Sequence, residues 1–290
     1  MATSETKIDK QTGDKTSVKP EEVMSLLDFV KIFIYAALMT FVLRLLVFDP
    51  FTIPSESMLP NLMTGDYLVV SKSSYGYSRH SFPLYSPDLF SGRIMESPVE
   101  RGDVVVFKLP RDNQTDYIKR IVGLPGDRVQ VQGGQLFVNG VGYERVKVDD
   151  FVLKVSENTD CLRFPQYRMQ VADGYECHYP QYRETMPNGL NYLTLDLRQG
   201  AMADDTRVYV VPAGHYFAMG DNRDNSIDSR WPSSDGVGFV PSENLVGRAV
   251  SVLWSSDGGA SWLLPWTWFS SARFERMFYS LSPDQPADEN

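Results

Sequence analysis

The apolar residues of the chain form one long run near the start and many short runs after it. Residues 26–48 are apolar apart from Asp28, Lys31, Thr40 and Arg44, and the stretch from Ile32 to Leu43 carries no charge. Roughly 20 apolar residues cross a bilayer as a helix, and the charged ends of Lys31 and Arg44 can extend toward the interface. The pattern predicts a transmembrane anchor over residues 25–48. The alternative is a buried core helix, although the sequence predicts few other helices for it to pack against.

The residues flanking this run indicate an uncleaved anchor. Residues 1–24 are polar, mixed in charge and free of aromatic side chains, which is typical of a disordered tail. The sequence RLLVFDPFTIP after the run lacks the small-x-small site at which signal peptides are cut. Lysines stand at positions 7, 10, 15, 19 and 31, so the positive-inside rule predicts a cytoplasmic tail, although Arg44 opposes this orientation.

Beyond the anchor, short β-branched runs separated by turn residues predict strands and hairpins, as in DYLVVSK, GDVVVFKL and RVQVQGGQLFVNG. Long amphipathic helices are scarce, so we predict a mainly β body. The predicted N-terminal parts are a cytoplasmic tail at 1–24 and the anchor at 25–48. A β core follows at 49–130, with an irregular extension at 77–100, and its second part lies at 208–258. An inserted subdomain at 131–207 separates the two parts of the core, and an aromatic-rich C-terminal segment and tail occupies 259–290.

Composition narrows the classes of function. The chain has 290 residues and a formal net charge of −9, and a nucleic-acid partner would require a clustered basic surface instead. The cysteines are Cys161 and Cys177, and His178 does not stand at zinc-ligand spacing from them, so no metal site is predicted. In an oxidising compartment the two cysteines could form a disulfide, whereas two buried free thiols are the alternative.

Two segments carry candidate catalytic side chains. In IPSESMLPNL, Pro54 and Pro60 stiffen a turn that holds Ser55 and Ser57, although such serines are usually turn or capping residues. In DYIKRIVGLPGDR, the basic pair Lys119 and Arg120 lies within an apolar strand. Alternation puts them on opposite faces and does not choose between them. Chemistry favours the lysine as a base, because arginine stays charged whereas a desolvated lysine can lose its proton.

A third segment, MGDNRDNSIDSR at 219–230, is too polar for a core strand. Its density of carboxylates, amides and guanidinium groups predicts a hydrogen-bonded loop or a binding site. A calcium loop is disfavoured because position twelve counted from Asp221 is Pro232, where such a loop needs an acidic ligand. A serine-histidine mechanism is also poorly supported, because His215 is the one histidine near this segment and no acidic partner can be named for it.

Taken together, these segments resemble the bacterial type I signal peptidase family, also called leader peptidases. The similar motifs are PSESM, RGDVVVFKLP, DYIKRIVGLPGD and GDNRDNSIDSR, in this order along the chain. The resemblance implies a mainly β catalytic core with an inserted second β-domain and one N-terminal transmembrane helix. It also implies site residues, namely Ser57 as nucleophile, Lys119 as general base, Ser55 and the backbone of Ser57 as the oxyanion hole, Ser226 orienting Lys119, and Asp228 and Arg230 supporting the loop.

The implied activity is a serine endopeptidase that removes N-terminal signal peptides from exported preproteins after A-x-A sites, through an acyl-enzyme and without a cofactor. The implied location is a bacterial inner membrane, with the catalytic domain in the periplasm and the chain acting as a monomer. A lysine base must be neutral, and at its ordinary pKa only about one lysine in 2,500 is neutral at pH 7. Burial must therefore lower that pKa by roughly 3 units, which takes about 4 kcal/mol.

Substrate specificity is expected to come from shallow apolar pockets around the motifs. The candidate side chains, each of which could equally be a core residue, are Phe51, Ile53, Leu62, Tyr117 and Ile118. Glu56 stands where the best-known relatives have glycine, and a carboxylate pointing into an oxyanion site would oppose catalysis. We therefore predict that Glu56 faces solvent.

Two further hypotheses concern the bilayer and the class of protein. The C-terminal segment WLLPWTWFSSARFERMF, residues 262–278, predicts aromatic side chains that contact the membrane interface or pack on the β core. A non-catalytic, membrane-tethered β-domain acting as a binding or assembly module is the alternative to an enzyme. That class would be expected to have lost the dyad, whereas Ser57 and Lys119 are both present.

Overall fold

A computed structural model describes residues 25–82, 91–161, 163–261 and 263–284, so the predicted cytoplasmic tail lies outside the described residues. The chain divides into two units, Met1–Phe41 and Val42–Asn290. Helix α1 (Leu26–Leu46) has a mean hydropathy of 2.1 and no buried residue. Its length and composition suffice to cross a membrane, as expected of the anchor predicted at 25–48.

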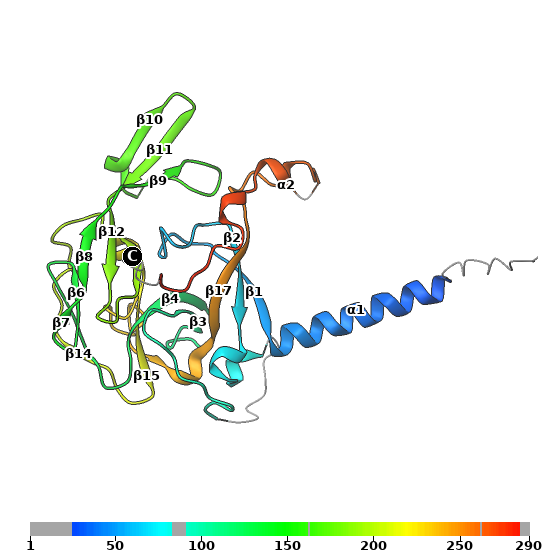
Figure 1. The fold of residues 1–290 in the computed structure, drawn as a ribbon, viewed down its shortest axis with the longest axis horizontal. Helices are drawn as coiled ribbons and strands as arrows, with labels where there is room; N and C mark the ends of the chain where they lie inside the picture. The colour runs from blue at the N-terminus through cyan, green and yellow to red at the C-terminus, as the bar shows by residue number, and fades with distance from the viewer. Residues whose placement is uncertain (1–24, 83–90, 162, 262, 285–290) are drawn as a thin grey trace, which may run out of the picture. The chain divides into compact units, whose positions relative to one another are not determined.

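A seven-stranded antiparallel sheet forms the centre of the second unit (Figure 1). Its strands lie side by side in the order β1 (Phe48–Thr52), β2 (Asp66–Ser71), β17 (Leu245–Ser255), β3 (Val104–Lys108), β4 (Asp116–Gly123), β15 (His215–Met219) and β16 (Val240–Pro241). Val104 and Val106 pack in one core cluster, and Val105 and Phe107 pack in another. Both faces of β3 are therefore buried, which explains its unbroken apolar sequence.

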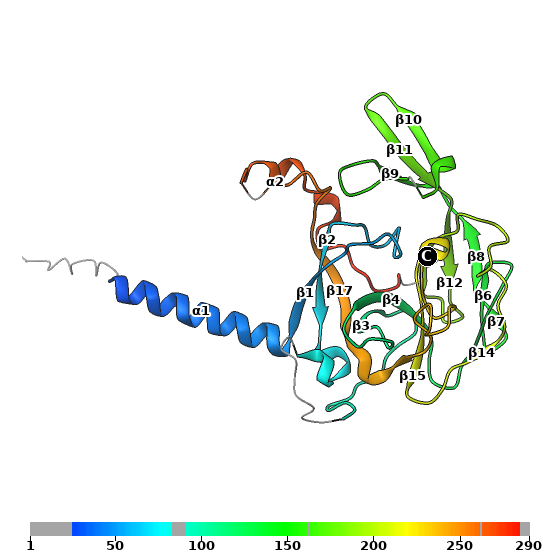
Figure 2. The same ribbon diagram turned by 180° about the vertical axis from the view of Figure 1, so that it is seen from behind.

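All other strands lie between β4 and β15 in sequence. A four-stranded sheet has the order β14 (Tyr209–Val210), β5 (Arg128–Gln132), β6 (Gln135–Val138) and β7 (Val141–Gly142). Two three-stranded sheets have the orders β13 (Asn191–Leu195), β12 (Gln181–Thr185), β8 (Glu144–Lys147) and β10 (Arg168–Val171), β11 (Gly174–Tyr179), β9 (Phe151–Lys154). The hairpin of β10 and β11 extends away from the other sheets in Figures 1 and 2.

These strands form a β insertion in the mainly β fold, as predicted. It is joined to the large sheet by a shared core, in which Val122 and Phe217 pack with Val129 and Leu136. The insertion is longer than the predicted range 131–207. Strand β5 begins before residue 131, and strand β14 lies after residue 207.

The two cysteines of the insertion form a disulfide, with Cα atoms of Cys161 and Cys177 5.8 Å apart. Both are buried in a core cluster that also contains Leu59 and Met63 from the segment after β1. The disulfide therefore fixes a part of the insertion that packs directly against the turn carrying Ser57.

The C-terminal segment combines a buried part with an exposed one. Arg276 donates to the fully buried carboxylate of Asp66 at 2.6 Å, and Leu281 lies in the core. In contrast, the short helix α2 (Thr267–Ser270) and its neighbours expose apolar side chains, including Trp266 at 68% and Phe269 at 72%. These aromatic side chains are available to a second surface.

Replacing both cysteines, as in C161S/C177S, is expected to lower the free energy of unfolding by about 3 kcal/mol, because the bond closes a loop of 16 residues. The measurement is denaturant unfolding of the full chain in detergent, with mass spectrometry without reduction to establish the bond in the parent protein. Equal stability of parent and variant would contradict this role.

Candidate active site

A tight turn after β1 presents Ser57 to a cavity. The backbone N–H of Leu59 donates to the carbonyl of Glu56 at 3.2 Å, and that of Leu62 donates to Met58 at 2.9 Å. Met58 and Leu59 are buried, so the turn is anchored by the apolar residues directly after the serine. Ser57 itself keeps 8% of its surface exposed.

Strand β4 brings Lys119 to this serine. Its Nζ lies 2.7 Å from Ser57 Oγ and also donates to the carbonyl of Ile118 at 2.8 Å. Burial lowers the pKa of Lys119 to about 8; Asp228 and Asp221 partly oppose this change, whereas Arg230 adds to it. Among the described residues Lys119 forms no ion pair, so no counter-charge within 4 Å holds its proton.

Arg120 lies on the other face of β4 and is equally buried. Its guanidinium donates to both oxygens of Asp221, at 2.8 and 2.7 Å, and to the carbonyl of Gly102. Burial would lower the pKa of Arg120, but pairing with Asp221 outweighs it and the pKa is raised. The two adjacent basic residues thus differ, because Arg120 is paired with a carboxylate whereas Lys119 has hydrogen bonds but no counter-charge.

The polar segment 219–230 folds into a loop held by its own charges. Arg230 donates to both oxygens of Asp228 at 2.9 Å, and the N–H of Gly220 donates to Asp228 at 3.0 Å. Burial alone would raise the pKa of Asp228, but the Arg230 charge and these hydrogen bonds lower it. The carboxylate is therefore stably ionised, and Asp228 and Arg230 lie where loop-supporting residues were predicted.

Ser226 does not make the contact with Lys119 that the sequence led us to expect. Its hydroxyl is buried beside the Asp228 carboxylate and contributes to the lowered pKa of that group. Among the described residues, the side-chain amine of Lys119 bonds to Ser57 and Ile118 instead. It packs against Gly220, where an added Cβ would lie 2.2 Å from Ser226 Oγ and 2.6 Å from the carbonyl of Ser57.

Asn222 is a site residue that sequence reasoning missed. Its backbone N–H donates to the carbonyl of Ser57, and its side-chain amide donates to the carbonyl of Glu56, both at 3.1 Å. The loop therefore holds the serine turn by two bonds from one residue. The density of amides in the segment was the available signal, but it did not distinguish Asn222 from Asn225.

The cavity beside the dyad has a volume of about 520 Å³. Its lining includes Ser55, Ser57, Tyr117, Ile118 and Lys119. The hydroxyls of Ser55 and Ser57 are 3.5 Å apart. The predicted site residues of the serine turn and of strand β4 therefore line one cavity.

A small adjoining pocket is lined by Phe51 and Ile53, together with Tyr117 and Ile118 from the main cavity. Leu62 is fully buried in the core and lines neither cavity. Four of the five predicted specificity residues thus border open space, and Leu62 packs behind them. No group of three or more His, Cys, Asp or Glu side chains is placed to hold a metal ion in the described part of the chain.

The prediction that Glu56 faces solvent is wrong. The side chain is half-buried and lines the cavity, and its carboxylate accepts a hydrogen bond from Asn225 Nδ2 at 3.2 Å. Burial and the nearby Asp160 raise its pKa, against weaker opposition from Arg163 and Asn225. The partners that cover Glu56 come from distant segments, so the local sequence could not reveal them.

A family model described as "Signal peptidase, peptidase S26" matches residues 26–254. The chain belongs to this family. Curated relatives named signal peptidase I include one from Rickettsia typhi, 35% identical over 86% of this chain and 91% of the relative. Another, from Rickettsia canadensis, is 34% identical over 87% and 92%. A solved signal peptidase I from Enterococcus faecalis V583 is 24% identical with a TM-score of 0.28, covering 52% of this chain and 97% of that one.

Membership in the S26 signal peptidase family confirms the resemblance drawn from the four motifs, and it makes the chain a peptidase. The matched region begins with α1 and ends in β17, so it includes every predicted site residue.

Gly220→Ala is expected to reduce peptidase activity by about 100-fold, because the new methyl group would displace Ser226 and the carbonyl of Ser57. Gly259→Ala is the matched control, since its Cβ would meet nothing closer than the Ser271 side-chain oxygen at 3.0 Å. Both variants are assayed on a peptide substrate after circular dichroism has established their fold. Full activity of a folded Gly220→Ala protein would show that the loop does not constrain the serine turn.

Proposed function

We propose that this chain is a serine endopeptidase that removes N-terminal signal peptides from exported preproteins after A-x-A sites, with Ser57 as nucleophile and Lys119 as general base. The observation that carries the proposal is the 2.7 Å approach of Lys119 Nζ to Ser57 Oγ. A buried lysine with a lowered pKa beside a serine hydroxyl is one of the arrangements that activate a nucleophile. The cavity beside the pair gives a peptide access to it.

The chemistry follows from this pair. Neutral Lys119 accepts the proton of the Ser57 hydroxyl while Oγ bonds to the scissile carbonyl carbon. Lys119 then gives the proton to the departing amine as the C–N bond breaks, which leaves an acyl-enzyme. Lys119 then takes a proton from a water molecule as the water attacks the ester carbonyl. Lys119 returns this proton to Ser57 Oγ as the ester bond breaks and the acid product leaves.

Burial supplies the neutral amine. With the pKa of Lys119 at about 8, roughly one molecule in ten is neutral at pH 7, compared with about one in 2,500 at the ordinary value. An aspartate bonded to the amine would stabilise the ammonium ion and lower the neutral fraction again. The nearby carboxylates of Asp228 and Asp221 are instead bonded to Arg230 and Arg120.

The developing oxyanion has two candidate donors beside the nucleophile. The backbone N–H of Ser57 donates to no acceptor among the described residues, and Ser55 Oγ lies 3.5 Å from Ser57 Oγ with its side chain exposed to the cavity. Donors of this kind act on charge that forms in the transition state. The shallow apolar pocket of Phe51, Ile53 and Ile118 suits the small residues of an A-x-A signal.

The proposal also includes attachment of the enzyme to the bilayer. Helix α1 would hold the enzyme in the inner membrane with its N-terminus in the cytoplasm and the catalytic unit in the periplasm, where the cysteines can be oxidised. The exposed Trp266, Trp268 and Phe269 would contact the membrane interface.

Ser57→Ala and Lys119→Ala are each expected to lower kcat/KM on a preprotein with an A-x-A signal by at least about 1,000-fold, because either change removes the proton-transfer pair. Lys147→Ala, which removes an exposed cation paired with Asp150 in the insertion, is the control. Undiminished cleavage by either dyad variant would reject the dyad.

The pH profile tests the state of the base. Because the neutral form of Lys119 is active and its pKa is lowered to about 8, kcat/KM should rise about tenfold per pH unit below pH 8 and level off above it. A rise that continues to pH 10 would contradict the effect of burial on this amine.

Replacing both Trp266 and Trp268 with Phe should remove most of the quenching of tryptophan fluorescence by brominated lipids in the reconstituted full-length protein, if these rings lie at the interface. Trp231→Phe, a change in the loop after Arg230, is the matched control. Equal quenching in the double variant and the parent would place these tryptophans away from the membrane.

A further inference from the structure

The two ends of the cavity around Ser57 differ in character. One end is mostly apolar, with Tyr117 and Ile118 continuing into the small pocket of Phe51 and Ile53. Asp116 also borders both spaces, but its carboxylate is paired with Lys108 at 2.8 Å. The other end is polar and is lined by Glu56, Arg163 and Asn225. A substrate bound across the serine would meet both environments, one on each side of the bond that is cut.

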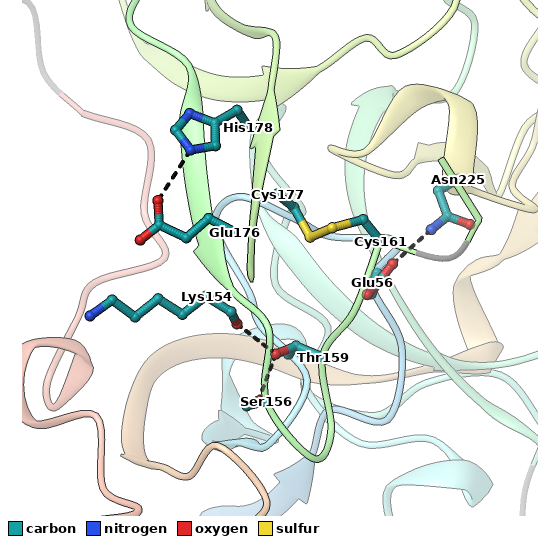
Figure 3. The surroundings of a disulfide bond; sticks show 9 residues. All are labelled: Glu56, Lys154, Ser156, Thr159, Cys161, Glu176, Cys177, His178 and Asn225. Atoms are coloured by element: carbon teal, nitrogen blue, oxygen red, sulfur yellow. Dashed lines mark hydrogen bonds and ion pairs between the residues drawn. A yellow bond between two sulfur atoms is a disulfide. The ribbon is translucent and has the colours of Figure 1, made fainter. Parts of the chain in front are cut away.

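Glu56 is held in this position from two directions. Its backbone carbonyl accepts from Asn222 Nδ2 at 3.1 Å, and its carboxylate accepts from Asn225 Nδ2 at 3.2 Å. Figure 3 shows the carboxylate pointing toward Asn225. The next residue is Ser57, so this charge is both fixed and close to the reacting bond.

The charges around Glu56 come from the segment that the disulfide secures. Asp160 and Arg163 flank Cys161, whose bond to Cys177 lies in the core behind the serine turn. Both act electrostatically on Glu56. Glu56 and Arg163 line this end of the cavity, and Asp160 adds a second negative charge that acts on Glu56 from nearby. The exposed Arg163 is screened by solvent more strongly than the half-buried Glu56.

We infer that Glu56 is a specificity-determining residue that favours substrates with a cationic side chain directly after the cleaved bond and disfavours acidic ones there. This inference rests on the proposed function. Because the apolar end fits the small residues of the signal peptide, the charged end faces the first residues of the departing chain. That chain also leaves with a new amino group, which becomes an ammonium ion beside the same carboxylate.

The test compares three peptides that share an A-x-A signal and carry Lys, Ala or Glu directly after the cut. For the full-length enzyme in detergent at low salt, kcat/KM for the Lys peptide should exceed that for the Glu peptide roughly threefold or more, as expected for a partly screened charge at close range. Glu56→Gln should bring this ratio close to one. Arg163→Gln should increase the ratio, and Glu144→Gln, an equal loss of charge at an exposed site in the insertion, should leave it unchanged.

The wild-type enzyme provides a second measurement that depends on no variant. Its Lys-to-Glu ratio should fall toward one as salt is raised to about 1 M, where charges are screened over roughly 3 Å. A ratio of one at low salt, a ratio that persists in Glu56→Gln, or a ratio that persists at high salt would overturn the inference, while cleavage of the Ala peptide upholds the proposed function. Failure of the wild-type enzyme to cleave the Ala peptide would reject the proposed function itself.

Discussion

The site depends on keeping one lysine amine buried beside a serine hydroxyl without a counter-charge. Burial disfavours the ammonium ion, but a single carboxylate in contact would restore it. The carboxylates around Lys119 are instead paired with arginines. Asp221 is paired with Arg120, and Asp228 is paired with Arg230. A third buried pair joins Glu184 and Arg223. These buried pairs make the region polar while leaving the amine itself unpaired.

The fold provides this environment through the position of β4. The strand lies inside the large sheet between β3 and β15, and its last residues are buried on both faces. Lys119 therefore reaches Ser57 from one face, and Arg120 anchors the loop through Asp221 from the other. The same loop returns across the serine turn, where Asn222 bonds to the carbonyls of Glu56 and Ser57. Lys119, Ser57 and the loop are thus positioned by one connected set of contacts.

The sequence predicted the anchor helix and the mainly β body because their signals are local, an apolar run and short β-branched runs. Alternation could not choose between Lys119 and Arg120, since a strand buried on both faces has no polar side. Glu56 was misplaced because its partner Asn225 stands 169 residues away. The contact expected between Ser226 and Lys119 followed from the resemblance, whereas the hydroxyl packs against Gly220 near Asp228. Contacts between distant segments leave no trace in local periodicity, and they decide how this site is built.

The most direct test of this account is the titration of Lys119 itself, by NMR of the protein with isotope-labelled lysine side chains and assignment through Lys119→Arg. The account predicts a midpoint at about pH 8. A midpoint near the ordinary lysine value of about 10.4 would contradict it, because only about one amine in 2,500 would then be neutral at pH 7 and able to act as the base.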